Sequence, residues 1–317
     1  MKISKFNSEQ ELKKEIYKHF KEYKVFKQTA FYVDKGACMY YDLSPDKKPH
    51  LLALQEKYYP FLKKYCCQGG EGKRVAIISL GCGNAKKEKD ILDKIYEDGY
   101  NFLFYGVDSS EGMVDLAEKE LAGSKFDYKL ACADFSKEDF ISELKEELSE
   151  FDFRLYAFIG CTFGNVEQDY MADILYDMLN EGDKLWMEVA VRSEINERGD
   201  ITLFERYLKY LDQGVRRDFY FRPLKEIGIP YENGEMFLSM VKEENLNDLK
   251  FIFRFKVLKK TVVCFDGRTV TLLPGTVVDL ITIRVYDPDG LVNFFKERNF
   301  KFIAKECNGV GQFLFEK

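Results

Sequence analysis

Between residues 75 and 191 the chain alternates short, almost wholly apolar runs with longer stretches in which apolar residues recur every three or four positions. A short continuous apolar run is typical of a strand covered on both faces, and the longer period is typical of a helix with one buried face. We therefore predict strands at 75–80, 102–107, 127–133, 154–160 and 184–191, and helices at 86–97, 112–121, 137–148 and around 171–178. Repeated strand–helix units predict a doubly wound parallel sheet with helices on both faces.

The pattern changes after residue 191. Residues 192–260 contain one predicted helix, at 204–211, and no repeated strand–helix unit. Residues 250–286 are rich in strand-forming residues and are interrupted by Asp266-Gly267 and by Pro274-Gly275, which indicate tight turns and hairpins. A short helix at 291–299 and two further strands, 300–306 and 312–317, then predict a closing antiparallel pair. The sequence therefore predicts a doubly wound core with an inserted antiparallel domain.

The first predicted strand ends in Gly81-Cys82-Gly83-Asn84, and the second ends in Asp108. Glycines at this place allow a tight turn and let a ligand approach the backbone closely. A dinucleotide fingerprint would have a third glycine at position 86, where this chain has lysine. A carboxylate at the end of the second strand accepts hydrogen bonds from the ribose hydroxyls of an adenosine group, which suits NAD and S-adenosylmethionine equally.

Asp134 and Phe135 follow the third predicted strand. They resemble the pair that class I methyltransferases place there, in which the carboxylate faces the adenine amino group and the aromatic ring lies near the base. Three successive strand ends with the expected residue types favour an S-adenosylmethionine site over a dinucleotide site.

The segments LGCGNAKKEKDIL, GVD, ADF and FIGCTFGNVEQ together resemble the histidine-specific Nα-methyltransferases of ergothioneine biosynthesis. Lys87 matches a lysine of that family's first helix turn, and Asn165 matches the asparagine after its fourth strand. Upstream, AFYVDKG and EKYYP resemble two family elements and place Tyr32 and Tyr58 on its substrate-facing tyrosines. The interval between these two elements is longer here than in the family.

The resemblance implies a Rossmann-like methyltransferase core of residues 61–191 and 287–317, with a smaller α+β substrate or lid domain of residues 1–60 and 192–286. It implies that Gly81 and Gly83 admit the methionine part of the donor and that Lys87 neutralises its carboxylate. Asn165 and Tyr32 would orient the acceptor amine, and no protein nucleophile or metal would be needed.

Other interpretations of the same residues stay open at this stage. The two tyrosines could be core residues, Asn165 could cap the following helix, and Lys87 could be a solvated lysine on a helix. A non-catalytic S-adenosylmethionine-binding regulatory protein and a dinucleotide-dependent oxidoreductase are the alternative functions.

One departure from the family bears on the acceptor. The family recognises the imidazole of histidine through a Glu-x-Ser pair on a late strand, and the corresponding stretch VVDLITIRVY places Ile281 and Ile283 there. Asp279 or Thr282 could replace the pair only with a shift of register. An apolar pocket would not satisfy an imidazole, so we predict N-methylation of a small amine or amino-acid-like molecule other than histidine.

Charge and composition narrow the function further. The net charge is −6, from 48 basic and 54 acidic residues, and no basic face indicates a nucleic-acid partner. The chain has only two histidines, His19 and His50, which argues against a histidine-rich metal site or a serine–histidine triad. No secretory signal or membrane-length apolar run is visible, and the eight cysteines form no Cys-x-x-Cys pair, so we expect a cytoplasmic protein with a small-molecule methyl acceptor. Nothing in the sequence indicates an oligomeric state.

Overall fold

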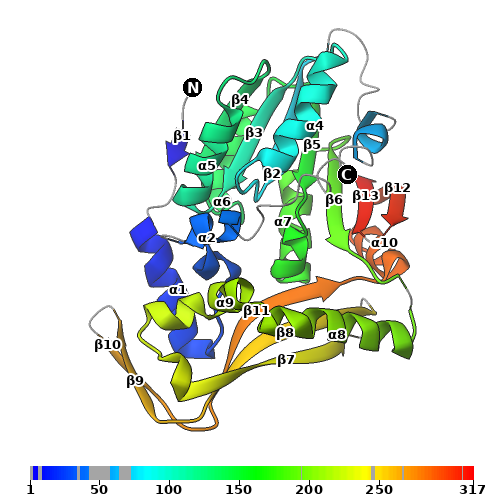
Figure 1. The fold of residues 1–317 in the computed structure, drawn as a ribbon. Coiled ribbons are helices and arrows are strands. Elements are labelled where there is room, and N and C mark those ends of the chain that lie inside the picture. The colour runs from blue at the N-terminus through cyan, green and yellow to red at the C-terminus, as the bar shows by residue number, and fades with distance from the viewer. Residues whose placement is uncertain are drawn as a thin grey trace. The chain divides into compact units, whose positions relative to one another are not determined.

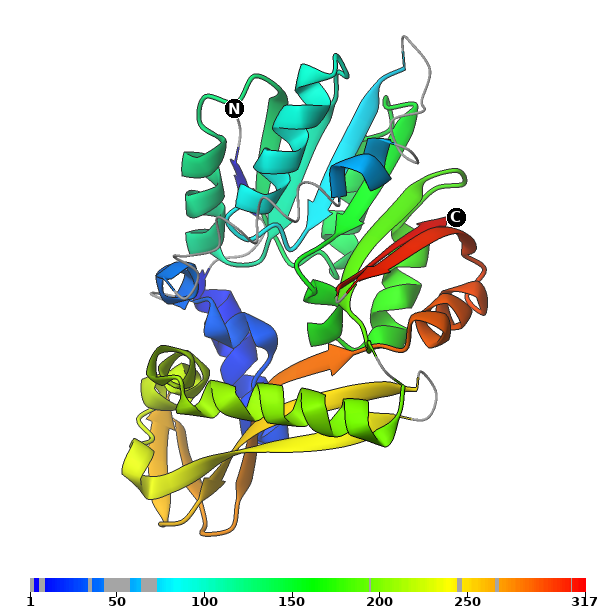
Figure 2. The ribbon, with the colours of Figure 1, turned by 45° about the vertical axis from the view of Figure 1, so that its right-hand side comes forward.

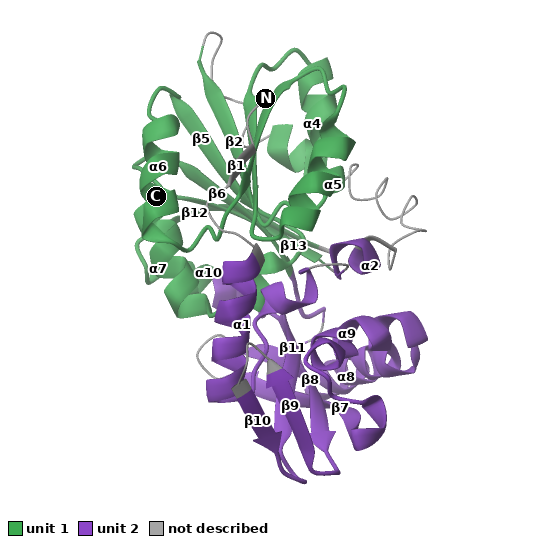
Figure 3. Ribbon diagram, turned by 90° about the vertical axis from the view of Figure 1, so that its left-hand side faces the viewer, with its two compact units in different colours: residues 1–7, 44–189, 292–317 green, residues 8–43, 190–291 purple. Residues whose placement is uncertain are grey.

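The computed structural model describes residues 3–5, 9–33, 36–42, 58–63, 73–193, 195–243, 247–265, 268–308 and 310–317. The chain forms two compact units, each described below by itself (Figure 3). Unit 1 comprises residues 1–7, 44–189 and 292–317, and unit 2 comprises residues 8–43 and 190–291. The predicted division of the chain into a donor domain and an acceptor domain stays a prediction.

Unit 1 is built on one eight-stranded sheet with the order β1-β4-β3-β2-β5-β6-β13-β12 (Figure 1). Its strands are β1 (Ile3–Lys5), β2 (Val75–Leu80), β3 (Leu103–Asp108), β4 (Asp127–Cys132), β5 (Phe153–Phe158), β6 (Lys184–Ala190), β12 (Lys301–Asn308) and β13 (Val310–Glu316). Strands β1 to β6 pair in parallel, and β12 and β13 form an antiparallel pair. The predicted α/β class and doubly wound parallel sheet are confirmed, but the short strand β1 at the edge was not predicted.

Four helices alternate with these strands: α4 (Lys86–Glu97), α5 (Glu111–Leu121), α6 (Glu138–Glu147) and α7 (Gln168–Met178). Helices α4 and α5 lie on one face of the sheet, and α6 and α7 lie on the other (Figure 3). Apolar residues at helical spacing, such as Ile91, Leu92 and Ile95 of α4, are buried against strand residues such as Phe104 and Leu155. Burying a side chain of this size contributes roughly 1.5–3 kcal/mol, so the pattern that predicts each helix also attaches it to the sheet.

Unit 2 contains a three-stranded antiparallel sheet, a two-stranded hairpin and helices (Figure 2). Its elements are α1 (Glu9–Tyr23), η1 (Gln28–Phe31), α2 (Gly36–Asp42), α8 (Glu197–Asp212), α9 (Gly214–Glu226), η3 (Tyr231–Asn233), β7 (Gly234–Glu243), β8 (Asp248–Val257), β9 (Thr261–Phe265), β10 (Arg268–Leu272) and β11 (Val277–Val285). Helix α10 (Pro288–Lys296) spans the last boundary between the two units. None of the strands between 250 and 286 enters the sheet of unit 1, as the sequence predicted. The turn residues 266 and 267 lie outside the described residues.

The prediction of a single helix between 192 and 260 is wrong, because α9 follows α8 directly. Every residue from Phe219 to Leu224 is buried, so α9 shows no apolar stripe at helical spacing. It also contains Pro223, which removes a backbone donor from a helix interior. The burial of residues 219–224 therefore outweighs both local signals.

None of the described helices is long and apolar enough to cross a membrane.

Candidate functional site

The loops that follow β2 and β5 lie at the point where the direction of strand order reverses. Strand β2 pairs in parallel with β3 on one side and with β5 on the other. In open α/β sheets, ligands bind beyond the carboxyl ends of the strands at such a switch point. The candidate donor-binding residues lie at or just after the carboxyl ends of β2, β3 and β4.

The loop after β2 adopts backbone conformations that require glycine. Gly81 and Gly83 have φ of +74° and +55°, where side chains other than glycine are strained. A Cβ on Gly81 would lie 2.9 Å from Cγ2 of Thr162, whereas a Cβ on Gly83 would meet no atom within 4 Å. The N–H groups of Gly81 and Cys82 both donate to the Val107 carbonyl, which joins this loop to β3. The open space therefore lies beside Gly83.

Asp108, at the end of β3, is held by backbone donors from both sides. Its Oδ2 accepts from the Gly83 N–H at 2.9 Å, and its Oδ1 accepts from the Ser110 N–H at 2.9 Å. Desolvation raises the pKa of Asp108, although these N–H groups act in the opposite direction. The cap of α5 is Ser110, whose hydroxyl accepts from the Met113 N–H, so Asp108 is not needed for capping. Each carboxylate oxygen retains acceptor capacity for a ligand hydroxyl.

Asp134 and Phe135 are half-buried beyond the end of β4. Oδ1 of Asp134 accepts from the N–H and the hydroxyl of Ser136, at 3.0 and 2.7 Å. The ring of Phe135 packs edge-to-face on Phe158, the last residue of β5, with centroids 5.5 Å apart. The contact brings the loop after β4 to the carboxyl end of β5.

Lys87, in the first turn of α4, forms an ion pair with a residue that the sequence analysis missed. Its Nζ lies 2.8 Å from Oε2 of Glu188, whose side chain is only 4% exposed, and the same oxygen accepts from the Gly160 N–H at 2.8 Å. Burial acts to lower the pKa of Lys87, but Glu188 outweighs it and the pKa is raised. Burial acts to raise the pKa of Glu188, but Lys87 and the other donors outweigh it and the pKa is lowered. An acidic residue inside the apolar run KLWMEVAV was the available signal for this pair.

Tyr58 packs beside this ion pair in a helical segment, residues 58–63. Its side chain is 1% exposed, its ring centroid lies 5.9 Å from the Lys87 ammonium, and it packs edge-to-face on Trp186. Burial and the Glu188 carboxylate raise the pKa of Tyr58. The hydroxyl is therefore close to Glu188, although it forms no hydrogen bond of regular geometry.

Asn165 ends the short turn η2 (Thr162–Asn165), which follows a left-handed turn at Gly160 and Cys161. Its side chain is half-buried and forms no hydrogen bond with the described residues. Helix α7 is preceded by Glu167 at the N-cap position, without a side-chain cap, so Asn165 does not cap it. The amide thus has donor and acceptor capacity for a ligand.

Tyr32 belongs to unit 2 and is described within that unit alone. Its hydroxyl accepts a hydrogen bond from Nε2 of Gln28 at 3.1 Å. Its ring contacts Tyr40 at 5.2 Å and Phe219 at 5.9 Å between centroids. Tyr32 is therefore part of an aromatic cluster in unit 2.

Ile281 and Ile283 lie on the core face of β11. They pair with Phe253 and Phe251 of β8, which are fully buried, and Ile281 is 7% exposed. The register shifts between residues 279 and 281, and Asp279 is engaged by Arg254 at 2.8 Å.

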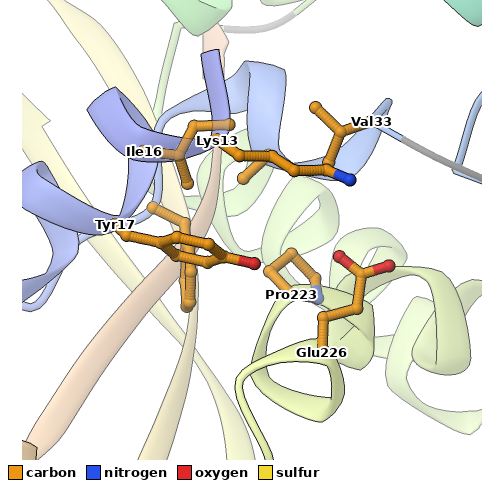
Figure 4. A pocket seen from close by; sticks show the side chains of 8 residues that line it. Lys13, Ile16, Tyr17, Val33, Pro223 and Glu226 are labelled. Carbon is orange, nitrogen blue, oxygen red and sulfur yellow. The ribbon is translucent and has the colours of Figure 1, made fainter. Parts of the chain in front are cut away.

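A small cavity of unit 2 contains none of the predicted residues. Figure 4 shows it between α1 and α9, with the Tyr17 hydroxyl directed towards α9. Its lining consists of Lys13, Ile16, Tyr17, Phe26, Ala30, Val33, Pro223 and Glu226. Among the residues that the structure describes, no cluster of histidine, cysteine and acidic side chains could hold a metal ion.

One comparison with known protein families finds a match to a methyltransferase family. Residues 56–191 match the family described as histidine-specific methyltransferase, SAM-dependent, where SAM is S-adenosylmethionine. Among curated proteins, no sequence matches this chain.

Several solved structures are similar to this chain at low sequence identity. A Pyrococcus horikoshii OT3 protein is 16% identical, with 87% of this chain and 93% of that chain covered and a TM-score of 0.47. A SAM-dependent methyltransferase from Anabaena variabilis is 11% identical, with coverage of 83% and 84% and a TM-score of 0.38. The plantazolicin methyltransferase is 14% identical, with coverage of 97% and 99% and a TM-score of 0.40.

The nicotinamide and non-catalytic alternatives receive no support from the family match. Over residues 56–191, this chain therefore resembles the histidine-specific family of S-adenosylmethionine-dependent methyltransferases.

Proposed function

We propose that this protein transfers a methyl group from S-adenosylmethionine to the nitrogen of a small amine or amino-acid-like molecule other than histidine. The observation that supports the donor site best is Asp108, a carboxylate fixed by two backbone N–H groups at the switch point of the sheet. The family match over residues 56–191 supports the same donor.

The donor-binding roles follow from the geometry of the loops. Gly83 leaves open space for the methionine part, and Asp108 accepts from the ribose hydroxyls. Asp134 and Phe135 lie where the adenine amino group and ring would be recognised. Lys87 has three N–H donors, so it can keep its bond to Glu188 and also donate to the donor's carboxylate.

Methyl transfer from a sulfonium requires little covalent assistance, because the bound donor supplies an activated methyl group. The protein then contributes by aligning the acceptor lone pair with the S–CH₃ bond and by excluding water. Asn165, with an amide that makes no hydrogen bond to the described residues, and Tyr32 are the residues we assign to the acceptor amine. Tyr58 is buried against Lys87, so we assign it the positioning of the Lys87–Glu188 pair.

The exclusion of histidine rests on Ile281 and Ile283. Both pair with phenylalanines of β8 on the core face, and Asp279 is held by Arg254. An imidazole facing these isoleucines would leave its N–H and its acceptor nitrogen unsatisfied, at about 1–3 kcal/mol each.

Calorimetry with S-adenosylhomocysteine tests the donor site. We expect binding of this product but not of NADH, and we expect Asp108→Asn to weaken it by about 1.5–3 kcal/mol through the loss of a charged acceptor. Asp115→Asn, on the exposed face of α5, is the matched control and should bind as the wild type does. Tight NADH binding without any response to S-adenosylhomocysteine would refute the proposal.

A methyl-transfer screen over amino acids and amines, with the methylated atom located by mass spectrometric fragmentation, tests the acceptor. We expect a methylated nitrogen on an acceptor that is more apolar than histidine. Efficient trimethylation of histidine would disprove the claim that histidine is excluded as the acceptor. Methylation only at oxygen or carbon would disprove the claim that the methyl group goes to an amine nitrogen. Donor binding without transfer to any acceptor would favour a non-catalytic protein.

A further inference from the structure

One carboxylate oxygen of Glu188 joins the helix that follows the glycine loop to the loop that carries Asn165. Glu188 lies in β6, which is separated from β2 by β5 in the sheet. Its Oε2 accepts from Nζ of Lys87, in the first turn of α4, and from the Gly160 N–H, each at 2.8 Å. Gly160 belongs to the loop of residues 159–165 after β5. The candidate donor site and the candidate acceptor loop, both in unit 1, therefore share one acceptor atom.

The loop after β5 turns sharply at the residue that Glu188 binds. Gly160 and Cys161 have φ of +79° and +61°, so two successive residues are left-handed. A cysteine in this conformation is unfavourable and has to be held there by its surroundings. Thr162 follows, and its hydroxyl donates to the Ile159 carbonyl at 3.0 Å. The bond from the Gly160 N–H to Glu188 therefore anchors the loop at its least favourable point.

The two bonds to Glu188 share the negative charge of one oxygen. Burial acts to raise the pKa of Glu188, but Lys87 and the other donors outweigh it, so the carboxylate is ionised and both bonds are charge-assisted. Lys87 has three N–H donors and a partly exposed side chain, so it can also bind a second carboxylate. If Lys87 divides its charge between two carboxylates, more of the Glu188 charge is left for the Gly160 N–H, and that bond becomes stronger.

We propose that Glu188 is a positioning residue that couples the donor site to the acceptor loop: when the carboxylate of the methyl donor binds Lys87, the bond between Glu188 and Gly160 tightens and fixes the loop that carries Asn165. This inference rests on the proposed function, in which Lys87 binds the donor's carboxylate and Asn165 orients the acceptor amine. The acceptor loop then responds to the amino-acid part of the donor. A nucleoside that fills only the adenosine part of the site leaves the loop unchanged.

Amide hydrogen exchange of the whole chain, measured by mass spectrometry with saturating ligand, tests this coupling. The two probes are S-adenosylhomocysteine and 5′-methylthioadenosine, which lacks the amino-acid part. In the wild type, we expect residues 159–165 to exchange at least about threefold more slowly with the first probe than with the second, because opening the loop breaks a strengthened hydrogen bond. Both probes should protect residues 134–136 equally, since both contain adenosine.

Three variants separate the coupling from a purely structural role of Glu188. Glu188→Gln keeps an oxygen for the Gly160 N–H but removes the charge, so the difference between the two probes at residues 159–165 should disappear. The double variant Lys87→Met/Glu188→Gln leaves no unpaired charge from this pair and should lose the difference too. Glu181→Gln, at an exposed position in the turn before β6, is the matched control and should keep it.

The possible outcomes distinguish the coupling from the proposed function. A purely structural role of Glu188 would change the exchange with both probes alike and leave their difference intact in Glu188→Gln. That result, or equal protection of residues 159–165 by both probes in the wild type, would overturn the coupling and retain the donor site. If neither probe protected residues 134–136, the proposed function would be rejected, and the coupling with it.

Discussion

Replacing Glu188 by glutamine tests the buried ion pair at the candidate donor site. The variant keeps the size of the side chain and an oxygen that can accept from the Gly160 N–H, but it leaves Lys87 without its partner at 2.8 Å. Removing one member of a buried pair typically costs about 3–5 kcal/mol, because an uncompensated charge is left behind. The Lys87 side chain is 23% exposed and keeps some hydration, so we expect a loss of about 2–3 kcal/mol.

Urea unfolding followed by circular dichroism at neutral pH measures this loss. Lys87→Met should be destabilising by a similar amount, since it leaves Glu188 buried and unpaired. The double variant Lys87→Met/Glu188→Gln removes both charges, and we expect it to recover at least half of the summed loss. A loss below about 0.5 kcal/mol for Glu188→Gln, or additive losses in the double variant, would refute the reasoning.

The pH dependence gives a second check with a defined sign. The pKa of Glu188 in the folded protein lies below its ordinary value of 4.5, so its contribution to stability is present above that value and is lost as the pH falls through the folded pKa. The pKa of Lys87 lies above its ordinary value of 10.5, so its contribution is lost only as the pH rises through the folded pKa. The difference in unfolding free energy between wild type and Glu188→Gln should therefore be constant around neutrality and shrink in acid. An equal difference in strong acid would contradict the assignment.

Three further changes test the local structure. Burial raises the pKa of Glu88 from 4.5 to about 7, so the wild type should lose stability as the pH rises through this range. Glu88→Gln should lack that loss, so its free energy of unfolding should rise by up to about 3 kcal/mol relative to the wild type between mildly acidic and mildly alkaline buffer. Urea unfolding measures this difference, and a difference that does not depend on pH would disprove the raised pKa. Gly83→Ala should cost about 1 kcal/mol through its positive φ alone, and Gly81→Ala should cost more because its Cβ would meet Thr162, so thermal unfolding should rank them in this order. Arg222→Met leaves two carbonyl groups, in η1 and just after it, without their donor, and should cost about 2–4 kcal/mol in unfolding free energy; a loss within measurement error would contradict it.

The sequence by itself determined the core of unit 1. Strands β2 to β6 form from short apolar runs, and helices α4 to α7 form from segments with apolar residues at helical spacing. Both patterns are visible within a window of about ten to twenty residues, so no tertiary contact is needed to predict them. Gly81, Gly83, Asp108 and Asp134 could also be read directly, because the end of each strand is visible in the sequence and parallel strands end at one edge of the sheet.

Only the tertiary structure decided which distant residues meet. Lys87 and Glu188 lie 101 positions apart, and their pairing depends on the position of β6 beside β5 in the sheet. Helix α9 could not be predicted because its consecutive residues 219–224 are all buried and include Pro223, so that tertiary packing outweighs local propensity. The stacking of Arg216 of α9 on Tyr210 of α8, with 3.9 Å between the guanidinium carbon and the ring centroid, likewise depends on how these two helices pack. Local sequence specifies which elements form, but the environment of a charged group is set by contacts that close only when those elements pack together.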